Sequence, residues 1–206
     1  MKILGLISGG IDSPVAIDMM LSKGYDVDVI HFDNTPFYEK EEHNKVIKII
    51  EFLRKKHYKF KAYLIPHGHA LTEFKNKARN NMTCLLCKRQ MLRMANIVCE
   101  NKGYDFILTG DSMGQVASQT VDNIKCISTG ISYPILRPLI GLDKQEIVQM
   151  AIKRGTYELS ISFNSKCGAV PSMPRTAGHM SEIEHNEKRV DIDDIVKYAI
   201  NNMKAI

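Results

Sequence analysis

Short apolar runs alternate with longer amphipathic stretches along this chain. Five runs have the length and aliphatic composition of buried strands, and they lie at residues 3–7, 27–32, 62–65, 106–108 and 134–136. Stretches with apolar side chains at helical spacing lie at residues 14–23, 40–57, 83–102, 144–154 and, near the end, 192–203. Strands that alternate with helices predict an α/β fold, a doubly wound parallel sheet of about five strands with helices on both faces.

Helix-end signals and loop composition indicate how the chain is divided. Asp143 is a typical N-cap, and Glu146 three residues later completes a capping box. Residues 171–178 (PSMPRTAG) are rich in proline and small residues, which predicts a flexible connection. We therefore expect a main domain over residues 1–170 and a C-terminal extension with a final helix over residues 171–206.

Composition excludes several classes of protein. The chain has 206 residues, 44% of them hydrophobic and 25% charged, which is ordinary for a globular domain and excludes disordered and fibrous proteins. No apolar run approaches the roughly 18 residues of a membrane span, and the first run is too brief for a secretory signal. We expect a cytoplasmic protein with no membrane partner. The net charge of +5 is compatible with a nucleic-acid partner without requiring one.

A glycine-rich junction follows the first apolar run and precedes the first helix. It contains Ser8, Gly9, Gly10, Asp12 and Ser13. Glycines at such a junction allow positive φ and close approach to an anion, and the first N–H groups of the helix point at it. A kinase-type loop has lysine where Asp12 stands, so transfer of a γ-phosphate is disfavoured. The alternative interpretation is a tight turn capped by one of the two serines.

Three sequence words carry a resemblance to a known family. They are SGGIDSPVA at residues 8–16, TGDSMGQVASQT at 109–120 and YPILRPLIGLDKQEI at 133–147. Together they resemble the PP-loop domain of the tRNA 4-thiouridine synthetases (ThiI-like), which are N-type ATP pyrophosphatases. The resemblance implies the Rossmann-like fold of the adenine nucleotide alpha hydrolases. It also implies an ATP-dependent tRNA sulfurtransferase that adenylates O4 of a uridine and then replaces AMP with sulfur.

The resemblance also implies a set of ATP contacts. They are Leu6, Ile7, Ser8, Gly9, Gly10, Asp12, Ser13, His31, Phe32, Lys88, Gly110 and Gln119. His31 and Phe32 would frame adenine, and Lys88 replaces an arginine that the family often has, which keeps the charge but loses the planar fork. Asp12 is expected to be catalytic. A carboxylate near phosphates requires a nearby cation, so we expect Mg²⁺, with Lys88 or Arg89 stabilising the leaving pyrophosphate.

The cysteines suggest a second kind of chemistry. Five cysteines without an export signal make disulfides an unfavoured interpretation. Cys84 and Cys87 form a CxxC pair, and Cys167 follows 80 residues later. By resemblance, Cys167 is a catalytic cysteine that carries or resolves a persulfide, and the three cysteines bind a [4Fe–4S] cluster with one open iron, as in archaeal relatives.

Spacing alone leaves other chemistry open at these cysteines. Zinc with a histidine as fourth ligand, a redox disulfide and a persulfide relay all use the same residue types. Cys99 and Cys126 show no pairing signal and are assigned no role. His67 and His69 follow a predicted strand, and we interpret them as loop residues because no third ligand accompanies them.

The substrate and partners are expected from basic residues and from the resemblance. A basic group near the CxxC pair, suited to phosphate backbones, consists of Lys75, Lys77, Arg79, Lys88, Arg89 and Arg93. The synthetases carry RNA-binding domains before the PP-loop, whereas seven residues precede Ser8 here. We therefore expect tRNA as substrate with a separate RNA-binding partner protein, or a homodimer. Sulfur would come from sulfide or from a persulfide protein.

Two other functions remain open from the sequence. One is an ATP pyrophosphatase that acts on an acceptor other than tRNA. The other is a nucleotide-binding module without catalysis, which explains the glycine-rich loop but gives no reason for three spaced cysteines.

Overall fold

A six-stranded sheet forms the centre of the protein in a computed structural model that describes residues 1–58, 60–114, 117–163 and 166–206. The strands are β1 (Lys2–Ile7), β2 (Asp26–Asp33), β3 (Ala62–Pro66), β4 (Phe106–Leu108), β5 (Ile135–Leu136) and β6 (Lys204–Ala205). Their order is β5-β4-β1-β2-β3-β6, and every neighbouring pair is parallel except β3 with β6. The predicted α/β class and mainly parallel sheet are confirmed.

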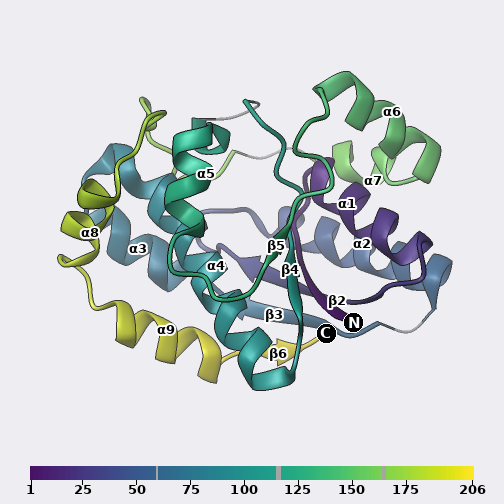
Figure 1. The fold of residues 1–206 in the computed structure, drawn as a ribbon, viewed down its shortest axis with the longest axis horizontal. Helices are drawn as coiled ribbons and strands as arrows, with labels where there is room; N and C mark the ends of the chain where they lie inside the picture. The colour runs from purple at the N-terminus through teal and green to yellow at the C-terminus, as the bar shows by residue number, and fades with distance from the viewer. Residues whose placement is uncertain (59, 115–116, 164–165) are drawn as a thin grey trace.

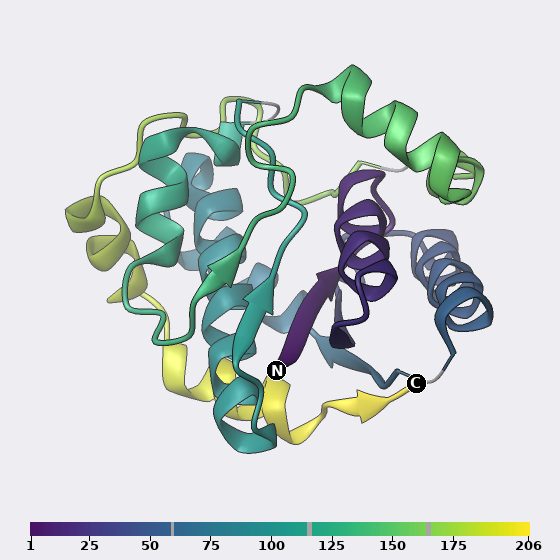
Figure 2. The same cartoon turned by 45° about the vertical axis from the view of Figure 1, so that its right-hand side comes forward.

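Helices cover both faces of the sheet, as Figures 1 and 2 show. One face carries α1 (Asp12–Ser22), α2 (Lys40–His57), α6 (Lys144–Arg154) and α7 (Tyr157–Ile161). The other carries α3 (Gly68–Lys77), α4 (Thr83–Lys102), α5 (Val121–Ser128), α8 (Met180–Glu187) and α9 (Ile192–Asn201). Two short 3-10 helices, η1 (Asn80–Met82) and η2 (Ala117–Gln119), lie before α4 and α5. None of the helices among the described residues has the length and apolar content needed to cross a bilayer.

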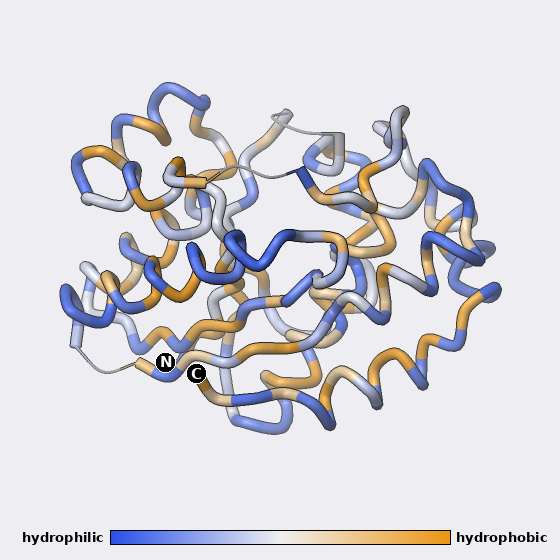
Figure 3. The backbone as a smooth tube through the Cα atoms, turned by 180° about the vertical axis from the view of Figure 1, so that it is seen from behind, coloured by the Kyte–Doolittle hydropathy of each residue, from blue (hydrophilic) through white to orange (hydrophobic). Residues whose placement is uncertain are grey.

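The apolar runs form strands because both of their faces are buried. In β1, Ile3 and Ile7 contribute to the core beneath α1 and α2, whereas Leu4 and Leu6 face the core beneath α4. This alternation is the period of two that a strand imposes. Each fully buried aliphatic side chain of this size contributes roughly 1.5–3 kcal/mol. Figure 3 shows the helices alternating between hydrophobic and hydrophilic residues around these strands.

Several elements were not expected from the sequence. The helices α3, α5, α7 and α8 are short, and β6 is a two-residue edge strand. The connection at residues 171–178 was expected to be flexible, but it is anchored. Arg175 N–H donates to the carbonyl oxygen of Asn81 at 3.0 Å, and Gly178 N–H donates to the Asn123 side chain at 2.8 Å. The capping box of Asp143 and Glu146 is confirmed.

The end of the chain joins the same sheet as the beginning. Ile206 N–H donates to the Ala62 carbonyl oxygen at 2.9 Å, and the Ile206 carbonyl oxygen accepts from Arg54 at 2.6 Å. The helix α9 packs its buried residues Ile195 and Ala199 into the core beneath α4. The expected domain boundary at residue 170 stays a prediction.

The loops after β1 and β4 approach each other closely. These strands are neighbours in the sheet, and the connections that leave them go to opposite sides, which makes this the switch point where open α/β sheets bind ligands. At Gly110, a Cβ would lie 2.5 Å from the backbone nitrogen of Ser13 and 2.6 Å from its Cα. Glycine is required here because backbone atoms of the first turn of α1 leave no room for a side chain.

We predict that Gly110→Ala lowers the free energy of unfolding by about 1–3 kcal/mol, because the added methyl group forces two backbone segments apart. Gly141→Ala is the matched control, since a Cβ there meets no atom within 4 Å and the backbone φ is not positive. The control should leave stability unchanged or raise it slightly. Urea denaturation measures both variants, and equal stability for the two would show that the loops separate without cost.

Candidate active site

A cavity of about 930 Å³ opens at the carboxyl ends of β1, β2 and β4. The expected ATP contacts and the three candidate metal-binding cysteines all line it. These residues are Leu6, Ile7, Ser8, Gly9, Gly10, Asp12, Ser13, His31, Phe32, Cys84, Cys87, Lys88, Gly110, Gln119 and Cys167. Residues 115 and 116 of the second sequence word lie outside the described residues. The fold thus brings segments separated by more than 150 residues to one place, while the role of each residue stays a prediction.

The loop after β1 has the form of an anion site. Ser8 N–H donates to Ser13 Oγ at 2.9 Å, and the two hydroxyl oxygens lie 3.0 Å apart. The residue before α1 is Ile11, whose side chain gives no capping hydrogen bond. The first N–H groups of a helix need acceptors, so an apolar residue at this position leaves them for a ligand.

Glycine allows positive φ, but neither Gly9 nor Gly10 adopts it. Positive φ among the described glycines occurs at other positions. At Gly9, a Cβ would instead collide with the side chains of Glu42 and Lys45, which reach the loop from α2. Gly10 has room, because the nearest atom to a Cβ there is Ser8 Oγ at 3.6 Å. The missing side chain at Gly9 therefore serves close packing and not an unusual backbone conformation.

Asp12 already has a cationic partner. Lys144 Nζ lies 2.6 Å from Asp12 Oδ1, and the Lys144 side chain is half exposed at the start of α6. The sequence argument required a positive group beside Asp12 and took it to be a metal ion. Lys144 supplies that group, and the sequence analysis missed it because 132 residues separate the two partners. The sequence did offer one indication, because Lys144 lies within the third segment that resembles the family, residues 133–147.

A second charged pair lies against the loop and was also missed. Lys45 Nζ lies 3.0 Å from Glu42 Oε1 and donates to the carbonyl oxygens of Phe163 at 2.7 Å and Ser160 at 3.3 Å. The side chains are largely buried, with 5% of Lys45 and 13% of Glu42 exposed. Residues three apart lie on the same face of a helix, so the sequence allows this ion pair. Ion pairs with this spacing are, however, usually exposed at the protein surface. The pair is buried because α7 packs against α2 and the loop at Gly9 lies against both side chains.

Strand ends form the side of the cavity that the resemblance assigns to adenine. His31 is buried and donates from Nδ1 to the Ile7 carbonyl oxygen at 3.2 Å. Burial lowers the pKa of His31 to about 4, so the ring is neutral at physiological pH. The His43 ring lies 5.7 Å from it, centroid to centroid. Phe32 is 6% exposed and presents an apolar surface next to it.

Lys88 belongs to a charge cluster at the other wall. Its Nζ lies 3.3 Å from Asp111 Oδ1, and Arg137 lies 3.3 Å from Asp111 Oδ2. Burial tends to raise the pKa of Asp111, but Lys88, a hydrogen bond from Thr109 and Arg137 outweigh it and lower this pKa. Arg89 does not line the cavity. It pairs with Glu187 of α8 at 3.1 Å, so the expected contribution of Arg89 at the phosphates lacks a geometric basis.

Several buried polar atoms on the cavity wall have no hydrogen-bond partner among the described residues. They are Asn34 Oδ1, Glu42 Oε2, His43 Nδ1, Gln119 Oε1 and Ser160 Oγ. A buried polar atom without a partner costs about 1–3 kcal/mol, and native structures contain few of them. Their concentration around one cavity indicates a cavity built for a polar ligand.

The three predicted cysteines line the cavity as free, half-buried thiols. Burial raises the pKa of Cys84, Cys87 and Cys167, and the negative charge of Cys167 would further raise that of the other two. The thiols are therefore protonated at neutral pH. Within the described residues, no group of three or more histidine, cysteine or acidic side chains has the arrangement of a metal site. Sulfur is a suitable donor for iron or zinc, but binding either would require deprotonation and side-chain movement.

His67 is the residue that connects β3 to α3, so the prediction of a loop residue is confirmed for His67 but is wrong for His69. His67 is fully buried, and its Nε2 lies 3.3 Å from Cys87 Sγ. Burial lowers the pKa of His67 to about 3, which keeps the ring neutral. His69 lies within α3 and is 3.5 Å from Asp194. The spacing of His67 and His69 in the sequence does not indicate that the His67 side chain packs against a cysteine.

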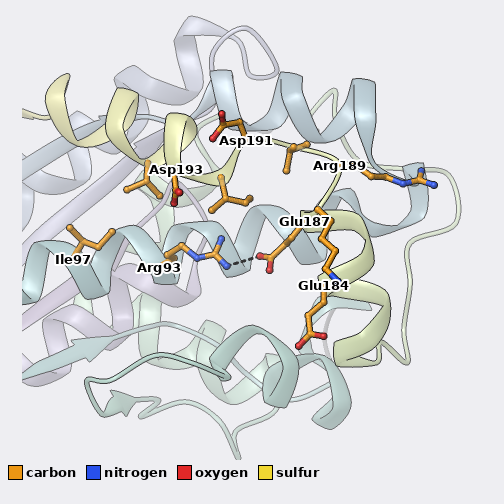
Figure 4. A pocket seen from close by; sticks show the side chains of 11 residues that line it. Arg93, Ile97, Glu184, Glu187, Arg189, Asp191 and Asp193 are labelled. Carbon is orange, nitrogen blue, oxygen red and sulfur yellow. Dashed lines mark hydrogen bonds and ion pairs between the residues drawn. The ribbon is translucent and has the colours of Figure 1, made fainter.

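Much of the expected basic group is paired within the molecule. Arg93 pairs with Glu187 at 2.7 Å, and Lys77 pairs with Glu73 at 2.6 Å. The Arg93 and Glu187 pair lies in a second hollow of about 850 Å³ between α4, α8 and α9, shown in Figure 4. This hollow shares no lining residue with the first cavity within the described residues. These side chains are less available to an RNA backbone than their sequence positions suggested.

Comparisons with known proteins agree on one family. The model of the family described as thiamine biosynthesis protein (ThiI) matches residues 1–192. A protein named probable tRNA sulfurtransferase from Methanothermobacter thermautotrophicus is 40% identical over 197 residues, which cover 95% of this chain and 51% of that protein. The chain thus spans about half the length of the curated relatives it matches.

Solved structures show the same relationship. The crystal structure of a 4-thiouridine synthetase and RNA complex with bound ATP superimposes with a TM-score of 0.93 at 33% identity, covering all of this chain and 54% of that one. The U34-tRNA thiolase NcsA from Methanococcus maripaludis with its [4Fe–4S] cluster has a TM-score of 0.52 at 14% identity, covering 98% and 66%, and shares the fold alone. On the extent of the family match and the sequence identity, the chain belongs to the ThiI family.

Proposed function

We propose that this chain is an ATP-dependent tRNA sulfurtransferase, which adenylates a uridine to form 4-thiouridine. The observation that carries the proposal is the gathering of the three sequence words and the three cysteines around one cavity. Relatives named probable tRNA sulfurtransferase and a 4-thiouridine synthetase with bound ATP and RNA support it. A nucleotide-binding module without catalysis would need the glycine-rich loop and the adenine-binding side of the cavity, but it would not need three cysteines there.

In this proposal, ATP lies across the cavity with its pyrophosphate end on the glycine-rich loop. The uncapped start of α1 and the amides around Gly9 and Gly10 would hold the β- and γ-phosphates. Adenine would lie near His31 and Phe32, whose burial and neutrality suit an uncharged base. Gln119 has a buried oxygen without a partner that suits a hydrogen bond from the adenine amino group or the ribose.

Cationic side chains surround the proposed position of the phosphates. Lys144 neutralises Asp12, Lys45 neutralises Glu42, and Lys88 pairs with Asp111. These lysines offset the carboxylates, and their charge would stabilise negative charge as the pyrophosphate leaves. We also propose that Mg²⁺ enters with ATP and is bound mainly by the phosphates, as is usual for this ion, with Asp12 as its nearest protein carboxylate.

Sulfur transfer would take place at the cysteine end of the cavity. We propose that Cys84, Cys87 and Cys167 hold a [4Fe–4S] cluster, with zinc as the alternative metal. The donor type and the common cavity support the proposal, whereas the side chains as they stand are not arranged around a metal. Three thiolates leave one iron open, and such a cluster supplies a place for hydrosulfide. His67 beside Cys87 would fix the orientation of that thiol.

The partners follow from the same proposal. The substrate is tRNA, and the sulfur donor is sulfide or a persulfide protein in the cytoplasm. We propose that a separate RNA-binding protein or a second copy of this chain helps to hold the tRNA. Support comes from the internal pairing of Arg89 and Arg93, which reduces the basic surface near the cavity.

The proposed activity is tested directly with the purified chain kept free of oxygen. Unmodified tRNA, ATP, Mg²⁺ and sulfide are supplied, with and without a cell extract as a source of partners. We expect AMP release that depends on tRNA, and 4-thiouridine in the digested tRNA by mass spectrometry. AMP release that depends on ammonia and a small acceptor, or stable ATP binding without turnover under every condition, would contradict the proposal.

We predict that Cys167→Ala separates the two half-reactions. The variant should keep RNA-dependent exchange between ATP and pyrophosphate, because no thiol takes part in adenylation, and should lose 4-thiouridine by at least about 100-fold. Cys126→Ala is the control, because this free cysteine is a buried residue of α5 and does not line the cavity. Loss of exchange in Cys167→Ala alone would show that this residue acts before sulfur transfer.

We predict that protein purified without oxygen contains iron and acid-labile sulfide. Replacing Cys84, Cys87 or Cys167 with serine should remove most of both, because each change removes one thiolate ligand. Replacing Cys126 with serine should leave the iron content unchanged. Iron and sulfide counts with visible absorption spectra measure this, and a colourless protein loaded with zinc would exclude the cluster.

A further inference from the structure

The carboxylate of Glu42 differs from the other acidic groups of the cavity. Five acidic side chains line it, at Asp12, Asp33, Glu39, Glu42 and Asp111. Among them, within the described residues, only Glu42 has an oxygen that is buried and without a hydrogen-bond partner. A carboxylate oxygen that is buried away from water needs a hydrogen-bond donor, so a donor on a bound molecule would satisfy Glu42 Oε2.

The other carboxylates are engaged or more open. Asp12 is paired with Lys144 at 2.6 Å, and Asp111 lies between two cations that lower its pKa. Asp33 accepts hydrogen bonds from the backbone and the hydroxyl of Thr35, at 3.0 and 2.7 Å. These contacts occupy oxygens of each carboxylate.

Lys45 fixes Glu42 against the phosphate loop. The pair is 3.0 Å apart, and two backbone carbonyls hold the lysine on its other side. A side chain at Gly9 would collide with both residues, so the carboxylate lies directly beside the loop. Tyr38, Glu42 and the three cysteines line the same cavity. Glu42 is therefore placed beside the loop after β1, in the cavity that the thiols also line.

This position matters because adenylation of uracil needs a base. When O4 of uracil attacks the α-phosphorus, the O4–P bond forms and the bond from phosphorus to the bridging oxygen breaks, releasing pyrophosphate. The electron pair of the C4=O4 π bond forms the new O4–P bond, and the electron pair of the N3–H bond forms the N3=C4 double bond. The N3 proton must leave in the same step for the adenylated base to be neutral. A carboxylate with a free oxygen is a suitable acceptor for it.

We propose that Glu42 is the catalytic base that accepts the N3 proton of the acceptor uracil during adenylation. The inference rests on the proposed function and adds a residue and a role to it. Oε2 receives the proton, while Oε1 keeps its pair with Lys45 and holds the carboxylate in place. His43 is the rival base, since its Nδ1 also lacks a partner, but its ring lies against His31 on the adenine side.

RNA-dependent exchange of pyrophosphate into ATP tests the proposal, with the whole chain and tRNA. Glu42→Gln should lower the exchange rate by about 100-fold or more. The affinity for ATP should be equal or tighter, because the change removes a negative charge beside a polyanion. Glu41→Gln is the matched control, as Glu41 is exposed on the same helix turn and does not line the cavity, and it should exchange at the normal rate.

A second measurement separates a base from a structural residue. In RNA that contains 5-fluorouridine, the electron-withdrawing fluorine makes N3–H more acidic, so the adenylation rate depends less on a catalytic base. The defect of Glu42→Gln should shrink on this RNA, whereas a distorted loop would give the same defect on both. A normal rate for Glu42→Gln, an equal defect on the two RNAs, or a defect in His43→Asn alone would overturn the inference. Absence of exchange in the unaltered protein with every RNA would overturn the proposed function itself.

Discussion

The contact between Gly110 and the first turn of α1 is the constraint on which the cavity depends. It holds the end of β4 against the phosphate loop after β1, so closely that a Cβ would reach backbone atoms of Ser13. These two strands are neighbours whose connections go to opposite faces, and the sheet therefore opens at this point. The loops after β1 and β4 form the base of the cavity, and residues of β2, α2 and α4 form its walls. A shift of either segment would displace the loop amides and the residues of η2 together.

Charge within the cavity is organised as pairs that span elements. Asp12 on α1 meets Lys144 on α6, and Lys88 on α4 meets Asp111 after β4. Partly buried pairs of this kind contribute little net stability, because desolvation offsets much of the attraction. Their arrangement has another effect. The cavity can accept a polyanion without a large repulsion from its own carboxylates, and each lysine is already positioned before the ligand arrives.

The sequence predicted what depends on neighbouring residues. Buried strands appear as apolar runs, the capping box of Asp143 appears in four letters, and the phosphate loop appears as a glycine-rich word. It did not predict what depends on distant partners. The pairing of Asp12 with Lys144, the burial of His67 against Cys87 and the engagement of Arg89 by Glu187 arise only when helices pack. Short elements such as α3 and β6 depend on the same packing, since few residues give little intrinsic preference.

The two ends of the cavity place opposite demands on their surroundings. In the proposed arrangement, N–H groups and cations surround the phosphates, whereas burial raises the pKa of the thiols of Cys84, Cys87 and Cys167. A neutral thiol is a poor nucleophile, so it does not compete with an acceptor oxygen for the α-phosphorus. Sulfur chemistry then requires an added positive charge, from a metal or another cation, to form the thiolates. In the proposed reaction, this difference favours an order in which oxygen is activated first and sulfur enters second.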